Sequence, residues 1–352
     1  MLVSTQTARA RVVGIHHTMN ASRPTPLAQA LLVALLLWPV AIRAEGKLKV
    51  QFLDVGQGDA TLITCPHGTH HLLIDSGDNK YPHSQENFQR DLKAALGGTG
   101  QKLEVAIASH PHSDHIGGME WVLTNYHVAT YIDNGQPAET ATWSHINTVR
   151  MKRVKSGALN YIDGKKSNLL KFKLCSAVSF TLITPAAQAK LSDTNDRSVG
   201  VRVESLGKSF LFVGDMEKAA EDAWLNKLGP DALKLARADV LKVGHHGSDT
   251  SSTEAFIHQV QPGYAFVMCG ARGVSTNVGY KHPRASTLRA YANWLDAKGD
   301  VPGEKTDDVW AYNKGTENWI TVPRPKRFWL TVADGIVTLE TDGQTINVTT
   351  EK

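Results

Sequence analysis

The densest group of residues able to do chemistry lies at positions 110–115, which read His-Pro-His-Ser-Asp-His. Four of these residues are common metal ligands: His110, His112, Asp114 and His115. Imidazole and carboxylate suit zinc, manganese or iron, and the segment lacks the thiolates that are typical of closed structural zinc sites. The group directly follows the apolar run 105–108, which favours a position at the end of a buried strand. The pattern therefore predicts a catalytic metal site.

Two further apolar runs end in possible ligands. Residues 210–215 end at Asp215, and residues 240–248 carry the adjacent pair His245 and His246. Because strand ends can meet at one edge of a sheet, these side chains are expected to join the first group. Asp215 could lie between two cations, although an Asp after a strand can also be a turn or N-cap residue. No Ser or Cys has a base and orienting partner of its own, and Gly-x-Ser-x-Gly is absent.

The elements that must position these residues alternate along the chain. We expect strands at 48–53, 60–64, 71–74, 105–108, 178–183, 199–204, 209–213, 240–243 and 264–268. Helical patterns lie at 84–96, 216–227, 252–260 and 286–297. Short buried strands alternating with helices predict a layered α/β architecture.

Two stretches are predicted to be insertions. Residues 134–173 are polar and loop-like, and their basic part, 150–173, favours either a solvated face or a surface for a polyanion. Residues 299–328 are rich in aromatic residues and proline, which predicts a loop or hairpin that covers hydrophobic surface. Stacking on a substrate is the alternative for this second stretch.

The N-terminal segment is not expected to be part of the fold. Arg9, Arg11 and Arg23 precede the apolar run 27–42, and Ala44 follows it. This order is typical of a signal peptide at 1–44, with an uncleaved anchor as the alternative. Residues 45–352 would then form one exported domain, periplasmic or secreted, with no further membrane-spanning segment. The formal charge of +4 includes this leader and so says little about partners.

The three cysteines, Cys65, Cys175 and Cys269, are too few for a disulfide scaffold. One bridge with a leftover thiol fits the sequence, and so do three buried free thiols. No Cys-x-x-Cys pair is present, so neither a redox motif nor a zinc ribbon is indicated.

Taken together, the motifs resemble the metallo-β-lactamase superfamily, and in particular the hydrolase domain of ComEC-type competence proteins. The resemblance covers roughly residues 48–350 and rests on segments 52–60, 74–77, 109–118, 195–198, 214–215, 242–248 and 281–283, with Thr331, 334–335 and 342–343 near the end. It implies a four-layer αββα sandwich that binds two divalent metal ions, zinc or manganese.

The resemblance also implies roles by position. His110 and His112 would bind one metal ion, and Asp114 and His115 the second. Asp215 would bridge the two ions, and His245 matches the last ligand. Residues expected around the ligands, rather than on the metal, are Asp75, Asn195 and Ser248.

One expected ligand is missing. Many members of the superfamily have a further histidine between the first group and the bridging Asp, but here that interval holds only His127 and His145. Neither follows a predicted strand. Asn195, Asp196 and Ser198 occupy the interval instead, so one metal ion would lack a side-chain ligand or take an oxygen.

Four residues are candidates for catalysis. Asp114 holds the second metal ion, and His246 either replaces His245 as a ligand or faces the substrate. His282, before Pro283, could reach the reacting group. Asp59 follows the flexible Gly56-Gln57-Gly58 turn and either positions groups at the metals or caps the turn.

The expected reaction is hydrolysis, in which a metal-activated hydroxide attacks phosphorus or a carbonyl carbon. The resemblance favours a phosphodiesterase or nuclease with nucleic acid as substrate. A hydrolase of esters, lactones or another small molecule is the alternative, and a non-catalytic binding module is a third possibility. DNA uptake does not follow, because the chain lacks the membrane spans of full competence proteins.

Overall fold

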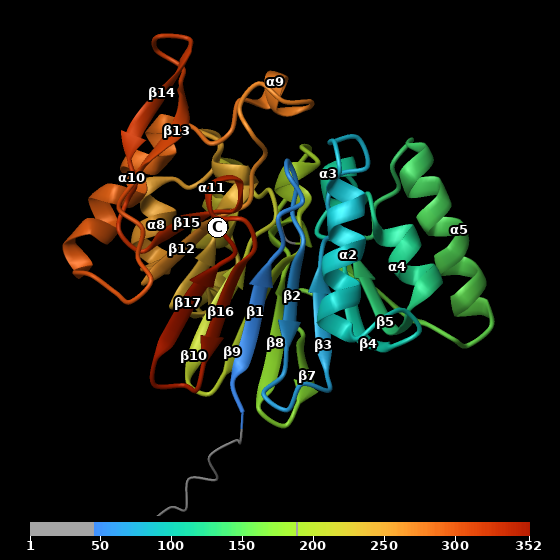
Figure 1. Cartoon of the computed structure of the whole chain (residues 1–352). Coiled ribbons are helices and arrows are strands. Elements are labelled where there is room, and N and C mark those ends of the chain that lie inside the picture. Colours follow the sequence, from blue (N-terminus) through green and yellow to red (C-terminus); the bar gives the residue numbers. More distant parts are fainter. Residues whose placement is uncertain (1–45, 188) are drawn as a thin grey trace, which may run out of the picture. The chain divides into compact units, whose positions relative to one another are not determined.

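The computed structural model describes residues 46–187 and 189–352. The leader predicted at 1–44 lies outside the described residues. Two β-sheets pack face to face, with helices on their outer sides (Figure 1). This is the four-layer αββα sandwich that the motifs predicted.

The first sheet has eight strands in the order β17-β16-β1-β2-β3-β4-β5-β6. Its strands are β1 (Leu48–Phe52), β2 (Thr61–Thr64), β3 (His71–Ile74), β4 (Lys102–Ile107), β5 (His127–Asp133), β6 (Asn160–Asp163), β16 (Val337–Thr341) and β17 (Ile346–Thr350). Strands β3 to β6 are parallel, whereas β17, β16, β1, β2 and β3 pair antiparallel. The carboxyl ends of β3 to β6 therefore share one edge of the sheet.

The second sheet has seven strands in the order β15-β12-β11-β10-β9-β8-β7. Its strands are β7 (Lys171–Cys175), β8 (Val178–Ile183), β9 (Gly200–Ser205), β10 (Lys208–Phe212), β11 (Val240–Lys242), β12 (Tyr264–Val267) and β15 (Phe328–Leu330). Strands β10, β11, β12 and β15 are parallel neighbours. A separate hairpin pairs β13 (Asp308–Asn313) with β14 (Asn318–Pro323).

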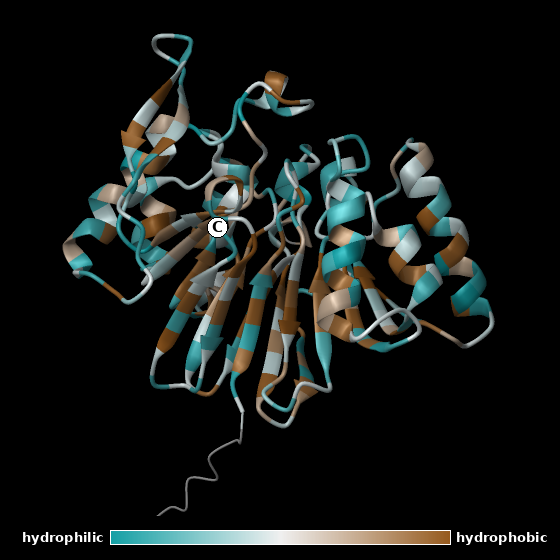
Figure 2. Cartoon of the chain, in the orientation of Figure 1, coloured by the Kyte–Doolittle hydropathy of each residue, from teal (hydrophilic) through white to brown (hydrophobic). Residues whose placement is uncertain are grey.

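The main core lies between the two sheets. Residues in β1 alternate between buried and half-buried, as the period of two in a strand requires. Phe52 of β1 stacks on Phe266 of β12 with ring centroids 4.4 Å apart. The same alternation of hydrophobic and hydrophilic residues is visible along the strands in Figure 2. Burying the apolar faces of both sheets against each other is the main stabilising term of this architecture.

Helices cover the outer faces. Phe88 of α2 (Ser84–Leu96) and Met119 of α4 (Met119–Asn125) are buried in the core cluster of the first sheet. A second cluster lies on the outer side of the other sheet, where Trp224 and Leu288 are buried with Leu211 and Leu241. Its helices are α6 (Lys218–Lys227), α7 (Gly229–Ala236), α8 (Glu254–Val260) and α10 (Ala285–Leu295). Shorter helices are α3 (Ser113–Ile116), α9 (Asn277–Tyr280) and α11 (Thr331–Asp334).

The expectation of a loop-like insertion at 134–173 is wrong. The segment contains helix α5 (Ala141–Lys155), strand β6 and most of β7. Of the α5 side chains only that of Ile146 is buried, so the helix lacks the apolar stripe from which sequence periodicity is recognised. The hairpin expected within 299–328 is present as β13 and β14.

The basic residues of α5 have structural partners. The Arg153 guanidinium donates to the carbonyl oxygens of Tyr126 and Val128, at distances of 3.1 and 3.3 Å. These carbonyls lie at the start of β5, at the opposite edge of the sheet from the His110 group that follows β4. The Arg150 guanidinium lies 4.0 Å from the centre of the Tyr161 ring. Arg153 is therefore used to hold the start of β5.

A disulfide joins Cys65, which follows β2, to Cys175 at the end of β7, and Cys269 is a buried free thiol. The bridge therefore links the two sheets.

Within residues 46–187 and 189–352, no helix combines the length and the hydropathy that crossing a bilayer demands.

Candidate metal centre

Strand ends from both sheets bring the predicted residues together. His110 to His115 follow β4 of the first sheet, while Asp215 and His246 follow the parallel neighbours β10 and β11 of the second. Gly214 allows the close approach, since it has a φ of +56° and an added Cβ would lie 2.9 Å from the Cβ of Ser109. An L side chain at this position would push the two sheet edges apart.

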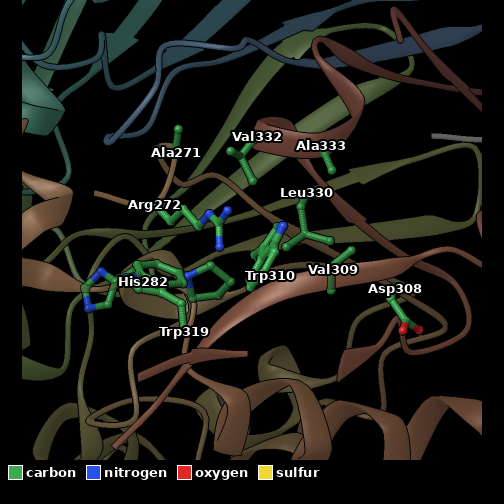
Figure 3. A pocket seen from close by; sticks show the side chains of 12 residues that line it. Ala271, Arg272, His282, Asp308, Val309, Trp310, Trp319, Leu330, Val332 and Ala333 are labelled. Atoms are coloured by element: carbon green, nitrogen blue, oxygen red, sulfur yellow. The ribbon is translucent and has the colours of Figure 1, made fainter. Parts of the chain in front are cut away.

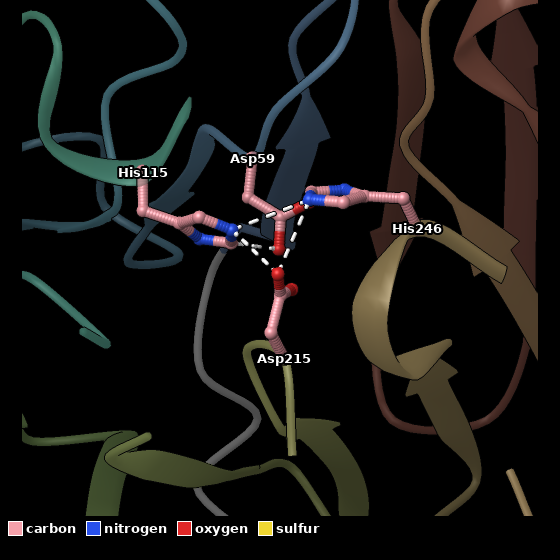
Figure 4. Close-up of side chains that lie close together, drawn as sticks. All are labelled: Asp59, His115, Asp215 and His246. Atoms are coloured by element: carbon pink, nitrogen blue, oxygen red, sulfur yellow. Dashed lines mark hydrogen bonds and ion pairs between the residues drawn. The ribbon is translucent and has the colours of Figure 1, made fainter. Parts of the chain in front are cut away.

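Four buried side chains form the tightest group of possible ligands: Asp59, His115, Asp215 and His246 (Figure 4). One ligand atom from each lies within 4.8 Å of the others. Asp215 Oδ2 is 3.1 Å from His115 Nε2 and 3.4 Å from His246 Nε2. Asp114 Oδ2 also approaches His246 Nε2, at 3.3 Å.

Neighbouring groups fix the orientation of both imidazoles. His115 Nδ1 donates to Asp75 Oδ2 at 2.8 Å, and Asp75 is itself held by the amide and hydroxyl of Ser109. His246 Nδ1 donates to the carbonyl oxygen of Met268 at 2.9 Å. The two Nε2 atoms are left facing each other at 3.3 Å beside the carboxylates. This is the arrangement by which proteins aim neutral imidazoles at a metal ion.

The electrostatics of the group fit a cation. Burial disfavours ionisation of Asp215, but His115 and His246 outweigh this and hold the pKa of that carboxyl well below its usual range. Burial lowers the pKa of His115, yet the carboxylates of Asp215 and Asp75 raise it well above its ordinary value. Within the described part of the chain, the buried Asp215 Oδ1 accepts no hydrogen bond. A buried oxygen without a hydrogen-bond donor is expected where a metal ion binds.

Further histidines lie around Asp215. His110 Nε2 and His245 Nε2 are each 3.8 Å from Asp215 Oδ2, and His112 Nδ1 is 3.0 Å from His110 Nε2. Four imidazole Nε2 atoms, those of His110, His115, His245 and His246, thus lie within 3.8 Å of the same oxygen, Asp215 Oδ2. His110 and His245 are the residues whose nitrogens would complete a second cation site with His112.

The histidine missing from the interval 116–214 is not supplied by the two candidates there. His127 is an exposed residue at the start of β5, and His145 on α5 pairs with Glu120 at 3.6 Å. His245 and His246 both approach Asp215 Oδ2, at 3.8 and 3.4 Å. The two histidines differ in their other contacts, because His246 also approaches Asp59 and Asp114 whereas His245 contacts Glu217.

The turn at 244–247 is what separates the two imidazoles. His245 and His246 both have left-handed backbone conformations, with φ values of 45° and 52°. Such conformations are strained for residues other than glycine and occur where the surrounding structure demands them. Here the turn sends His246 into the buried group and His245 toward Glu217, whose Oε1 lies 2.9 Å from His245 Nδ1.

Asn195 and Ser248 line the cavity next to the ligand residues and take part in the hydrogen bonds around His245. Asn195 Nδ2 donates to Glu217 Oε1 at 3.3 Å, and the Ser248 hydroxyl bonds to that of Thr250 at 2.9 Å. Thr250 in turn donates to Glu217 at 2.8 Å. Both residues therefore support the surroundings of His245.

Lys242 is a residue of the site for which the motif at 242–248 predicted no role. Its side chain is 2 % exposed, and its ammonium contacts the Asp59 carboxylate and lies 3.9 Å from Asp215 Oδ1. The only sequence signal is a lysine at the end of the apolar strand β11. A buried cation among carboxylates offsets part of their mutual repulsion.

His282 borders the site from the C-terminal part of the chain. It is buried, and Gln57 Nε2 lies 3.5 Å from its Nδ1, while Gln57 Oε1 accepts from the amide of Gly270. The Gln57 orientation makes Nδ1 an acceptor, so the proton of the neutral ring lies on Nε2. Burial, with the nearby His246 and His245, lowers the pKa of His282 well below its ordinary value.

The donor groups open into a cavity of about 350 Å³. His112, Asp114, Asp215, His245, His246 and His282 line it. Arg284 and Lys314 add positive charge to its wall, and both lie near Asp249, at 3.6 and 3.4 Å. The ligand groups are therefore accessible to a substrate, and the side chains of Arg284 and Lys314 lie beside the cavity through which it would enter.

An αββα sandwich with histidine and carboxylate ligands gathered at the shared strand edge defines a class of metal-dependent hydrolases. The model of the Metallo-beta-lactamase superfamily matches residues 53–162 and 191–271, more than half of the chain. The protein belongs to that superfamily.

Curated relatives carry competence-related names. ComE operon protein 3 of Bacillus subtilis (strain 168) is 30% identical over 266 residues, which is 72% of this chain and 31% of the relative. Competence protein ComA of Neisseria gonorrhoeae is 26% identical over 259 residues, 73% of this chain and 31% of the relative. The chain thus spans less than a third of the length of these two proteins.

Two solved structures are similar to the chain at low sequence identity. A metallo-β-lactamase mutant from Cronobacter sakazakii is 13% identical with a TM-score of 0.35, covering 58% of this chain and 79% of its own. The metallohydrolase Igni18 from Ignicoccus hospitalis is 12% identical with a TM-score of 0.38, covering 62% and 81%.

Proposed function

We propose that the protein is a metal-dependent phosphodiesterase that acts on nucleic acid. The observation that carries the proposal is the set of histidine and carboxylate donors around Asp215, which opens into a cavity flanked by Arg284 and Lys314. Cationic side chains beside a metal site suit a phosphodiester, because its charged oxygens pair with guanidinium and ammonium groups. The competence-related names of the relatives support the same substrate class.

The residues present fit two divalent cations. His115, His246, Asp114 and Asp59 would hold one, and His110, His112 and His245 the other, with Asp215 between them. When bound, divalent cations supply a nucleophile at neutral pH and stabilise charge on the phosphoryl oxygens.

The chain's own residues would orient the substrate. Arg284 and Lys314 would exchange their contacts with Asp249 for the phosphate oxygens. His282 would donate a hydrogen bond from Nε2, because Gln57 occupies Nδ1. Its position at the cavity wall suits a contact with the leaving group.

The proposal is tested by hydrolysis of bis-p-nitrophenyl phosphate and single-stranded DNA with added zinc or manganese. We expect the rates of Asp114→Ala and His115→Ala to be roughly 100-fold or more below the wild-type rate. Removing a metal ligand should cost at least as much activity as removing a residue that orients a ligand. His145→Ala, an exposed histidine change on α5, is the matched control and should keep that rate.

Equal phosphodiester rates in the wild type and both ligand variants would overturn the proposal. Hydrolysis confined to a lactone or a chromogenic β-lactam would favour the small-molecule alternative. Binding of less than one equivalent of metal would favour a non-catalytic module.

We also propose that the domain works outside the reducing cytoplasm. The Cys65–Cys175 disulfide supports this, because such bonds persist mainly in oxidising compartments. Alkylation of the protein from its native host without reductant should label one cysteine after unfolding. Labelling of all three would contradict the proposal.

A further inference from the structure

A second pocket adjoins the candidate metal centre. Its volume is about 290 Å³, and it lies between the β13–β14 hairpin, the segment 270–272 and the end of β15. His282 lines both this pocket and the cavity of the metal centre. A substrate whose phosphate lies at the donor groups would therefore place a neighbouring substituent in the second pocket.

The lining of this pocket suits a flat aromatic group. Val309, Leu330 and Val332 give it apolar surface, and Trp310 and Trp319 of the hairpin add two indoles. Figure 3 shows His282 at one end of the pocket and Asp308 at the other, with the indoles and Arg272 between them. Indole rings are stacking surfaces for nucleobases of any sequence.

Trp310 is not explained by packing alone. Its side chain is 44% exposed, and the Arg272 guanidinium lies 3.5 Å from the centre of its ring. An exposed indole paired with a planar cation forms a rigid platform, on which a base can stack against either plane. A hairpin that merely covered the core would bury this ring instead.

The charges around the pocket give a substrate one orientation. Lys281 and Arg284 lie at the His282 end, where they contact the Tyr312 ring at 4.6 and 5.0 Å. The Asp308 carboxylate lines the opposite end. A phosphate is therefore favoured beside His282, and its attached base is directed toward the indoles.

We infer that this pocket binds the nucleobase next to the scissile phosphodiester of a single-stranded nucleic acid. The inference rests on the proposed phosphodiesterase function and adds the nucleobase as the part of the substrate that the enzyme recognises. A duplex is a poor substrate in this arrangement, because a stacked and paired base cannot enter the pocket.

Two chromogenic diesters with the same leaving group test the inference. One is the p-nitrophenyl ester of thymidine 5′-monophosphate, and the other is methyl p-nitrophenyl phosphate, which has no base. In Trp310→Ala we expect the ratio of their kcat/KM values to fall roughly 5-fold or more, mainly through KM for the thymidine ester. Trp310→Phe should keep most of the ratio, and Met151→Ala, which truncates an exposed apolar side chain on α5, should keep all of it.

A binding measurement separates this inference from the proposed function. With a chelator present, fluorescence anisotropy compares a labelled thymidine tetranucleotide with an abasic tetramer of equal length. The wild type should prefer the thymidine oligomer, and Trp310→Ala should lose that preference. If this preference exists but neither diester is hydrolysed, the phosphodiesterase proposal fails and the base pocket stands. If both diesters are hydrolysed with an unchanged ratio in Trp310→Ala, the base pocket is overturned.

Discussion

His245 and His246 are adjacent residues with the same left-handed backbone, yet their imidazoles have different neighbours. His246 is 1 % exposed and contacts Asp59, Asp114 and Asp215. His245 contacts Glu217 and Thr250 and reaches Asp215 only at 3.8 Å. The two side chains should therefore differ in how strongly they hold a metal ion.

Replacing His246 should weaken metal binding more than replacing His245. Because His246 has three carboxylate neighbours and a fixed Nδ1, we expect His246→Ala to lower zinc affinity roughly tenfold more than His245→Ala. Competition with a chromophoric chelator measures both affinities. Equal losses in the two variants would show that the turn does not divide the ligands as described.

The ligand types could be predicted from sequence, but their partition could not. Strand ends with His and Asp are recognisable because apolar runs stop at them. The division between His245 and His246 depends on two backbone angles that no motif encodes. The Lys242–Asp59 contact joins the end of β11 to a turn of the other sheet, and such a pairing appears only once the sheets are packed.

The thiol of Cys269 should not react with thiol reagents in the native protein. Burial raises the pKa of its thiol to about 12, so the reactive thiolate is scarce at pH 8. We expect a thiol reagent to label no cysteine in the native, non-reduced protein and one after unfolding in guanidinium. Rapid labelling of the native protein would mean that the thiol is accessible.

At the scale of elements, helix α6 connects the metal centre to the outer layer. Asp196 Oδ1 accepts hydrogen bonds from the amides of Glu217 and Ala220, 3.0 and 2.9 Å away, at the start of the helix. Glu221 accepts from the amides of Ser252 and Thr253, just beyond the turn that holds His245 and His246. The helix thus fixes both strand-end segments of the second sheet.

Glu221 should make folding stability depend on pH. Burial raises the pKa of Glu221 to about 7 in the folded protein, above the value of roughly 4.3 for an unfolded chain. Between these values the unfolded state releases a proton that the folded state keeps. The stability of the wild type should therefore fall as pH rises, by about 1.4 kcal/mol per pH unit at most.

Glu221→Gln keeps the shape of the side chain and removes its titration. Urea unfolding of both proteins at pH 5 and pH 7.5 should show the wild type losing stability relative to this variant as pH rises. Parallel pH profiles would mean that the three donors around the carboxylate keep it ionised.

The elements that sequence reasoning found are those that bury an apolar face. The strands that lead to the ligands end in buried residues, so β10 and β11 were predictable from hydrophobicity. Strand β6 has no fully buried residue, and α5 buries a single one, so neither gives a clear period. These outer elements are ordered by their neighbours rather than by their own pattern.

At the scale of the whole molecule, the Cys65–Cys175 bridge ties the two sheets across a sequence separation of 110 residues. A link that closes so long a loop restricts the unfolded chain strongly. The bridge therefore complements the interface between the sheets, where Phe52 stacks on Phe266.

Removing the bridge should destabilise the domain by about 2–5 kcal/mol. We expect Cys65→Ala/Cys175→Ala to shift the urea midpoint downward, and a reductant to have the same effect on the wild type. The reductant should not shift the midpoint of the double variant, which serves as its control. An unchanged wild-type midpoint in reductant would mean that the bridge is not formed in solution.

The pairing of β1 with β16 sets an order of assembly. Leu48 and Phe52 lie opposite Thr341 and Val337, so β1 acquires this neighbour only after the long stretch of chain between them has been synthesised. Contacts between such distant parts of a chain form slowly, and an unpaired edge is prone to self-association in the meantime. A ribosome-bound chain that ends before β16 therefore holds its ligand-bearing strands without the completed sheet beside them, and it depends on rapid completion or on a chaperone to stay soluble.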